Sequence, residues 1–291
     1  MLPFELPAPA GYSVTPKWDG KNFVFGDQCS PVLEYSENFA GWSDDLTALH
    51  EEVAGDSHPI DLASRNDAFE QVKKFMPSAQ AVIMDIGCSS GFLIRDLSKA
   101  FPEAVILGAD VVKESLYRLA RSLPGIPLLR FDLLKCTLPD QIVDVLVMLN
   151  VLEHIEDDVT ALQKAFNLLK PGGVLIIEVP AGPYLYDSYD AELHHFRRYA
   201  ASGLQEKLTK AGFDVYRKSH LGFVLFPVFA AVKLLNMLTS HCKNKAVVRD
   251  QVGSTSSSGL VKLAMKFESK YLSDFQLPFG IRALITVRRP A

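Results

Sequence analysis

Apolar residues occur in two patterns that alternate along the chain from about residue 80 onward. Short, nearly continuous apolar runs lie at 82–86, 105–109, 128–131, 144–149 and 174–178. Runs of this length are typical of strands that are buried on both faces, whereas the stretches between them repeat every three or four residues, as amphipathic helices do. The alternation predicts an α/β fold in which helices cover both faces of a parallel sheet.

The pattern predicts further elements toward the two ends of the chain. Residues 213–218 and 277–287 are predicted to be two more strands. Between them lie the most apolar stretch of the chain, at 221–238, and an amphipathic stretch at 260–272, which together predict a helical insertion. Residues 31–76 are predicted to form two helices.

These patterns divide the chain into four parts. An irregular arm and the first helices occupy residues 1–76, the α/β core 77–220, the helical insertion 221–275 and the last core strand 276–291. The arm is rich in proline, glycine and aromatic residues. It is predicted to pack on the core or over its active site, with a partly disordered leader as the alternative.

The composition narrows the classes of partner. The chain has 291 residues, of which 48% are hydrophobic and 22% charged, as expected for a protein with a sizeable core. Its net charge of −4 offers no general attraction to nucleic acid, so no nucleic-acid partner is expected. The four cysteines lack the paired spacing of a zinc site or a disulfide framework, and the N-terminus lacks the pattern of a secretory signal. We therefore expect a reducing, cytoplasmic location.

A turn rich in small residues follows the first apolar run. Asp85 stands near the end of that run, and Gly87 and Gly91 bracket the turn. Glycines here allow positive φ and let a ligand approach the main chain closely. A dinucleotide-binding loop would need glycines where Ser89 and Phe92 stand, and a phosphate-binding P-loop would need a lysine after its last glycine. The acid beside the turn instead favours a positively charged ligand.

The spacing Asp-x-Gly-x-x-x-Gly resembles motif I of the class I S-adenosylmethionine-dependent methyltransferases, whose cofactor carries an ammonium and a sulfonium group but no phosphate. Asp110, Asp132 and Asn150 stand at the ends of the next apolar runs, and a Pro-Gly-Gly sequence precedes the fifth run, in the order of this family. The resemblance covers roughly residues 75–220. The segment 187–199 resembles a bacterial-type subgroup related to the ubiquinone-type methyltransferases.

This resemblance implies a Rossmann-like, doubly wound mixed sheet of seven strands with the last one antiparallel, plus an N-terminal helical lid. It implies S-adenosylmethionine as the cofactor, with Asp85 near the methionine ammonium and Asp110 on the ribose hydroxyls. Asp132 would accept from the adenine amine and Val111 would pack on the adenine. The other residues assigned to the cofactor site are Gly87, Cys88, Ser89, Gly91, Leu133 and Asn150, and the candidate pocket residues of the lid are Trp42, His50, His58 and Arg65. Each strand-end acid has the alternative role of capping a solvated strand terminus.

Candidate proton acceptors follow the fourth and fifth predicted strands. His195 is the first candidate for a general base, with His154 and His194 behind it, because histidine can accept a proton at neutral pH. Glu153 stands beside His154, where the family places groups near the transferred methyl. In the competing interpretations, the histidines tie the loop to the sheet and the Glu153–His154 pair caps a helix. No spacing typical of a metal site is present, so methyl transfer without a metal is expected.

The methyl acceptor is predicted only by class. A small molecule, or a lipid- or carrier-linked intermediate recognised by the insertion, is expected, with oxygen as the leading acceptor atom and nitrogen or carbon behind it. For residues 221–240 three interpretations compete: a buried helix or homodimer surface, an interfacial helix in peripheral contact with a membrane or a lipid-linked substrate, and a membrane span. Two other functional classes stay open, a nucleotide-dependent oxidoreductase and a catalytically silent protein that binds S-adenosylmethionine.

Overall fold

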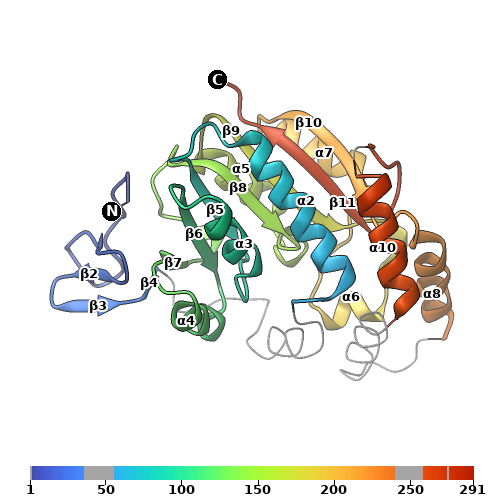
Figure 1. Cartoon of the computed structure of the whole chain (residues 1–291), viewed down its shortest axis with the longest axis horizontal. Helices are drawn as coiled ribbons and strands as arrows, with labels where there is room; N and C mark the ends of the chain where they lie inside the picture. The colour runs from blue at the N-terminus through green and yellow to red at the C-terminus, as the bar shows by residue number, and fades with distance from the viewer. Residues whose placement is uncertain (1, 36–55, 240–257, 274) are drawn as a thin grey trace.

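The computed structural model describes residues 2–35, 56–239, 258–273 and 275–291 (Figure 1). The first of the two helices predicted within 31–76, together with the candidate pocket residues Trp42 and His50, lies outside these ranges.

Within the described residues, eight strands form the central sheet in the order β10-β11-β9-β8-β5-β6-β7-β4. Only β11 runs antiparallel to its neighbours, β9 and β10. The strands are β4 (Val32–Glu34), β5 (Val82–Ile86), β6 (Val105–Asp110), β7 (Leu128–Arg130), β8 (Val143–Leu149), β9 (Leu169–Pro180), β10 (Asp214–Leu221) and β11 (Arg282–Arg288). The predicted Rossmann-like fold, with an antiparallel last strand beside the fifth, is confirmed.

One strand of the sheet was not predicted. Residues 32–34, assigned by pattern to a helical segment, instead pair in parallel with β7 as β4. Val32 and Leu33 are buried against the core, so this edge strand is stabilised by tertiary packing and has too few residues to show its own period. The arm before it forms a small antiparallel sheet of β1 (Lys17–Trp18), β2 (Phe23–Phe25) and β3 (Gln28–Ser30).

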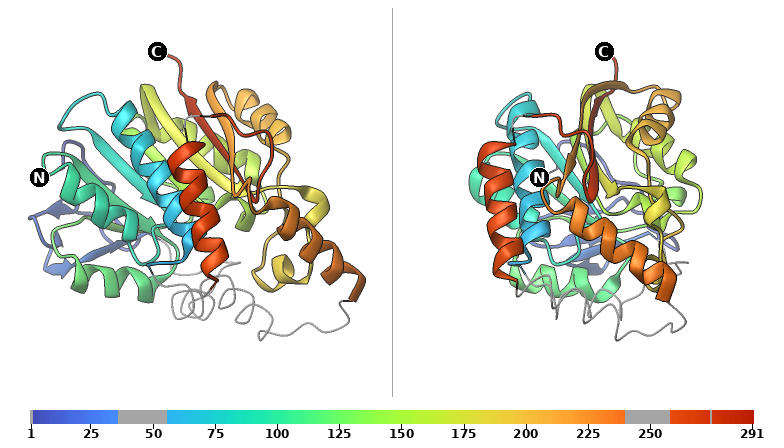
Figure 2. Two further views of the ribbon diagram at one scale, coloured as in Figure 1. Left: turned by 45° about the vertical axis from the view of Figure 1, so that its right-hand side comes forward. Right: turned by 90° about the vertical axis from the view of Figure 1, so that its right-hand side faces the viewer.

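Helices cover both faces of the sheet, as Figure 2 shows edge-on in its right-hand view. The cluster of buried residues on one face joins α2, α3 and α4 to the sheet, and the cluster on the other face joins α5 and α7. The helices are α2 (Pro59–Phe75), α3 (Phe92–Ala100), α4 (Lys113–Ser122), α5 (Asp158–Leu168), α6 (Ser188–Glu192), α7 (Ala201–Lys210), α8 (Phe226–Thr239) and α10 (Gly259–Tyr271), with short 3-10 turns η1 (Leu133–Lys135), η2 (Leu152–His154) and η3 (Pro183–Leu185).

The insertion between β10 and β11 contains the two predicted helices, α8 and α10. Helix α10 lies beside α2, where Met265 packs with Ile60 and Ala63 (Figure 1). The carboxylate of Glu268, which is buried, accepts hydrogen bonds from the backbone N–H groups of Gly222 and Val224, at 2.7 and 3.0 Å. These bonds fix α10 to the end of β10. Over the described ranges, no helix is long and apolar enough to cross a bilayer.

Candidate active site

A cavity of about 850 Å³ opens at the carboxyl ends of the parallel strands. Loops that follow β5, β6, β7 and β8 form one side, and α8, the start of α2 and the loop before β11 form the other. Ligands of open α/β sheets bind at this edge. Of the residues predicted for the cofactor and the chemistry, those that line the cavity are Gly87, Ser89, Asp110, Val111, Asp132, Leu133, Asn150, Glu153, His154 and His195.

Asp110 is held rigidly at the end of β6. Its Oδ1 accepts a hydrogen bond from the N–H of Val112 at 2.9 Å, and its Oδ2 accepts from the N–H of Ser89 at 2.8 Å. A carboxylate oxygen can accept more than one hydrogen bond, so a carboxylate at this position suits ligand hydroxyls. The assignment of Asp110 to the ribose hydroxyls stays a prediction.

The glycine-rich loop uses its own N–H groups internally. Those of Gly87 and Cys88 donate to the carbonyl of Ala109, at 2.8 and 3.1 Å, and that of Gly91 donates to the carbonyl of Cys88 at 2.8 Å. Gly87 has φ near +78°, and a Cβ there would lie 2.3 Å from a methyl of Val151. The loop is therefore a tight floor for a ligand, and these N–H groups are not directed at a phosphate.

Three predicted cofactor residues do not line the cavity. They are Asp85, Cys88 and Gly91, all of them buried. Burial, together with the nearby charge of Asp110, raises the pKa of Asp85 to about 8. Asp85 is thus neutral at pH 7 until a cation approaches, which differs from the permanently charged acid that the sequence suggested.

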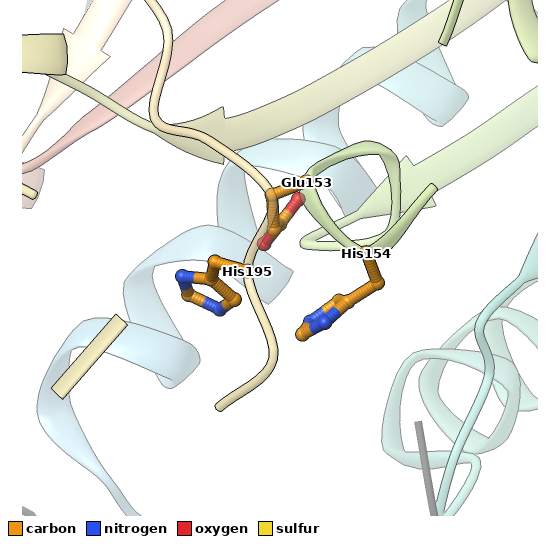
Figure 3. A group of neighbouring side chains, drawn as sticks. All are labelled: Glu153, His154 and His195. Atoms are coloured by element: carbon orange, nitrogen blue, oxygen red, sulfur yellow. The ribbon is translucent and has the colours of Figure 1, made fainter. Parts of the chain in front are cut away.

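Glu153, His154 and His195 come together from two separate segments, η2 and the loop after α6. One oxygen or nitrogen atom of each lies within 4.8 Å of the others, and the two imidazole rings meet edge to face at 4.7 Å between centroids (Figure 3). Among the buried side chains that the structure describes, both carboxyl oxygens of Glu153 lack a hydrogen-bond partner. A buried carboxyl group without a partner is costly, so its position on the cavity wall points to a functional role.

The protonation states within this cluster follow from its burial. Burial is the main cause that raises the pKa of Glu153 to about 8, and it also lowers the pKa of His154 to about 3, with the neighbouring His195 adding to that effect. At neutral pH the site therefore presents a protonated carboxyl group and a neutral His154. Both are hydrogen-bonding groups without net charge.

His195 is oriented by a buried acid. Its Nδ1 lies 2.9 Å from Oδ1 of Asp190, and a carboxylate can only accept, so Nδ1 carries the proton and Nε2 keeps its lone pair. Burial lowers the pKa of His195, although the hydrogen bond to Asp190 opposes that shift. Burial would raise the pKa of Asp190, but the hydrogen bond from His195 and the charges of Arg198 and Lys233 outweigh it, so Asp190 stays ionised. A neutral, oriented imidazole is a suitable general base.

His194, the other candidate in this loop, is placed differently from His195. It is exposed, does not line the cavity and has φ of 56°. This placement does not favour a catalytic role for His194.

A second buried ion network was not anticipated from the sequence. Arg282, on β11, donates to Oε1 of Glu178 at 2.9 Å and also to a carboxylate oxygen of Asp61. Asn150 donates to the same Oε1 of Glu178 at 2.9 Å. Because Arg282 and Asp61 line the cavity, these contacts join helix α2 to the sheet at the site. His58, a candidate pocket residue, lines the cavity too, whereas Arg65 pairs with Asp96 outside it.

These residues fit S-adenosylmethionine. The cavity volume is within the range of small-ligand sites. Apolar side chains that line its floor and walls near Asp110 offer a surface for an adenine ring, and the acids at the strand ends suit hydroxyl, amine and cationic groups. The apolar residues are Ile86, Val111, Phe131 and Leu133.

Comparisons with known proteins agree with this fit. Residues 84–177 match the family model described as a methyltransferase domain. The chain is 29% identical over 138 residues to a protein of Mycolicibacterium smegmatis named a probable S-adenosylmethionine-dependent methyltransferase, covering 46% of this chain and 52% of that one. It is 30% identical over 118 residues to trans-aconitate 2-methyltransferase of Azoarcus sp., covering 40% of this chain and 44% of that one. The chain thus spans about half the length of these curated relatives.

The fold likeness reaches further along the chain. Phosphoethanolamine N-methyltransferase 2 of Haemonchus contortus, solved with phosphomonomethylethanolamine and S-adenosylhomocysteine, superposes with a TM-score of 0.54 at 15% identity, over 84% of this chain and 60% of that one. At this identity the likeness shows the shared fold, and the site must be argued from this chain's own residues.

Proposed function

The chain is a member of the class I S-adenosylmethionine-dependent methyltransferase family, and we propose that it methylates an acceptor that has an apolar portion. The acceptor atom in this proposal is an oxygen, and no metal takes part. The observation that carries it is one cavity with two unlike halves. The half beside the strand ends presents Asp110, Asp132 and Asn150, and the half below α8 holds the Glu153–His154–His195 cluster.

The bound cofactor supplies a methyl group on a sulfonium, which is already activated for displacement. The protein must hold the acceptor oxygen in line with that methyl and exclude water. In the proposed step, Nε2 of His195 accepts the hydroxyl proton while the oxygen–carbon bond forms and the carbon–sulfur bond breaks. The protonated carboxyl of Glu153 donates a hydrogen bond to the acceptor or to a neighbouring imidazole.

The acceptor side of the cavity supports an apolar substrate. Side chains from the insertion and from the loop before β11 form this wall: Leu225, Val228, Phe229, Val232, Val261 and Ile281. Phosphate-binding groups would be expected for a free nucleotide or sugar phosphate, whereas an apolar wall suits a lipid, a prenyl chain or an aromatic ring. The acceptor we propose is therefore a lipid- or carrier-linked molecule, or a small apolar one.

The outer face of the insertion supports a peripheral membrane contact. Val228 and Val232 are exposed and also line the cavity, so the apolar surface of α8 continues into it. On α10, an exposed apolar stripe runs beside three exposed lysines, which is typical of helices that bind anionic membranes. The stripe is Leu260, Leu263, Phe267 and Tyr271, and the lysines are Lys262, Lys266 and Lys270.

Cofactor binding is tested first by calorimetry with S-adenosylhomocysteine, and NADH serves as the competing ligand. Binding of S-adenosylhomocysteine is expected. Preference for NADH would instead support an oxidoreductase, while cofactor binding without turnover would support a silent partner protein.

Methyl transfer is tested with isotopically labelled S-adenosylmethionine and extracts separated into lipid and aqueous fractions. Label is expected in the lipid fraction. Because the proposed acceptor atom is oxygen, the labelled product should not react with amine-specific reagents, which would detect N-methylation. Label confined to the aqueous fraction would contradict an apolar acceptor.

Membrane contact is tested by flotation with vesicles of anionic or neutral lipid. We expect the protein to float with anionic vesicles and to lose that behaviour in Leu263→Asp/Phe267→Asp. If these substitutions instead dissociate a dimer and vesicle binding is absent, the face is a homodimer surface.

A further inference from the structure

The apolar helix α8 carries one charged residue, and that residue points into the protein. Lys233 stands between residues that are exposed, Val232 and Leu234, yet it is itself fully buried. Its Nζ donates to Oδ1 of Asp187 at 2.6 Å and to Oδ2 of Asp190 at 2.9 Å. A buried ammonium is retained only where its hydrogen bonds and charge are satisfied, so α8 is fixed to α6 by these two bonds.

Asp190 connects Lys233 to the proposed base. Its Oδ2 is held by Lys233, while its Oδ1 accepts from His195 and from Nη1 of Arg198, each at 2.9 Å. Arg198 is anchored in turn on the carbonyl of Ala181 at 2.8 Å. Both oxygens of Asp190 are therefore held by hydrogen bonds, the N–H of Asp187 also donating to Oδ2, and Lys233 is the partner that comes from the insertion.

We propose that Lys233 is a positioning residue that sets the orientation and charge environment of His195 through Asp190. This inference rests on the proposed function, in which His195 is the base. It assigns the insertion a second task, because α8 both forms the acceptor wall and completes the polar support of the base. The site is then fully assembled only when α8 is docked.

The charges around His195 show in which direction its pKa moves when the charge of Lys233 is removed. Asp190 on α6 and Asp187, which caps that helix, contribute two negative charges, and Arg198 and Lys233 balance them with two positive ones. Glu153 and His154 of η2 also lie near the ring, and both are uncharged at neutral pH. Removing the charge of Lys233 leaves the surroundings of the imidazole net negative, which favours its protonated form.

The test uses the full chain with labelled histidine and measures the titration of His195 by NMR, in the presence of S-adenosylhomocysteine. The chain has seven histidines, and the His195 signal is assigned by its loss in His195→Gln. In Lys233→Met the pKa of His195 is expected to rise by about one unit, since a neighbouring charge shifts a pKa by about 1–3 units. Lys233→Arg should restore it, and the matched control Lys266→Met, on exposed α10, should leave it unchanged.

Kinetics give the second readout. In Lys233→Met the acid limb of the kcat/KM profile should move to higher pH by the same amount, so that activity falls by up to about tenfold on the acid side of the limb while activity at pH 9 changes little. Asp190→Asn should shift the limb in the opposite direction. Where Lys233→Met proves unstable, Lys233→Gln keeps a donor without the charge and should show the same upward shift.

The proposal is overturned if the pKa of His195 does not change in Lys233→Met while that protein still binds S-adenosylhomocysteine. Lys233 would then be a structural residue. The same holds if kcat falls equally at all pH values. A shifted titration in a protein whose wild type methylates nothing would instead contradict the proposed function, so the two failures are distinguishable.

Discussion

Glu153→Gln tests the chemistry of the buried cluster and predicts opposite effects on stability and activity. The carboxyl of Glu153 is fully buried, lacks a hydrogen-bond partner and has a pKa near 8 in place of 4.5. In the unfolded chain this group loses its proton near pH 4.5, whereas in the folded protein it keeps it until about pH 8. The folded state is therefore progressively destabilised as pH rises between these two values.

The magnitude follows from the retained proton. One pKa unit corresponds to about 1.4 kcal/mol, so Glu153 destabilises the wild type by about 3 kcal/mol at pH 7 and by almost nothing at pH 4. Glutamine has nearly the same shape and no proton to exchange. Its own unpaired amide destabilises by roughly 1–3 kcal/mol, but that contribution is independent of pH.

The assay is the free energy of unfolding in urea from pH 5 to pH 8, compared between wild type and Glu153→Gln. The advantage of the variant should grow by about 1.4 kcal/mol per pH unit from pH 5 to pH 7.5. Other titrating groups, including Asp85, cancel in this difference. Glu70→Gln, at an exposed position on α2, is the matched control and should show no such slope.

The same substitution, Glu153→Gln, should lower activity although it raises stability. Because the amide cannot act as an acid, kcat is expected to fall about tenfold or more, while affinity for S-adenosylhomocysteine is retained. A stability difference that does not vary with pH would refute the assignment of Glu153 as a buried, protonated acid. Unchanged kcat would remove it from the proposed chemistry.

Further predictions concern the cofactor side and the metal question. Asp110→Asn should weaken S-adenosylhomocysteine binding roughly ten- to a hundredfold, as expected for hydrogen bonds to a charged group, and unchanged affinity by calorimetry would contradict its ribose role. Binding of S-adenosylmethionine at pH 7 should release about one proton, because the approaching ammonium lowers the pKa of Asp85 below 7 from about 8. The released proton makes the calorimetric heat of binding depend on the buffer, and Asp85→Asn should abolish that dependence. Dialysis against EDTA should leave the transfer rate unchanged, and a loss that Mg²⁺ restores would contradict metal-independent transfer. Gly87→Ala should lower the melting temperature and weaken cofactor binding, because its Cβ would meet Val151 at 2.3 Å on a backbone with positive φ.

Much of the fold could be predicted because the buried strands are continuous apolar runs. Their order, the Asp-x-Gly-x-x-x-Gly turn and the acids that follow define a parallel sheet and its ligand edge without any knowledge of tertiary contacts. The strand β4 escaped prediction because it has three residues and exists only by pairing with β7. Its stability comes from its contacts with the core and not from its own short sequence.

The cofactor side was more predictable than the acceptor side for a related reason. Asp110 and Asn150 sit at strand ends, which sequence position alone identifies. The buried ion networks around the acceptor side do not follow a local pattern. Arg282 meets Glu178 across 104 positions of the chain, and Lys233, which reaches Asp190, lies in a helix that is apolar almost throughout. His194 and His195 are adjacent in the sequence, and only the structure shows that His195 lines the cavity whereas His194 does not.

The placement of the insertion has an evolutionary consequence. It leaves the sheet at Leu221 and returns at Arg282, which are paired neighbours on β10 and β11, so its two ends are already closed by the sheet. Lengthening or shortening a segment whose ends are held in this way changes the entropy of closure only slowly, by about 0.6 kcal/mol for each doubling. This insertion can therefore change in length at little cost in stability, and the strands on either side of it need not change with it.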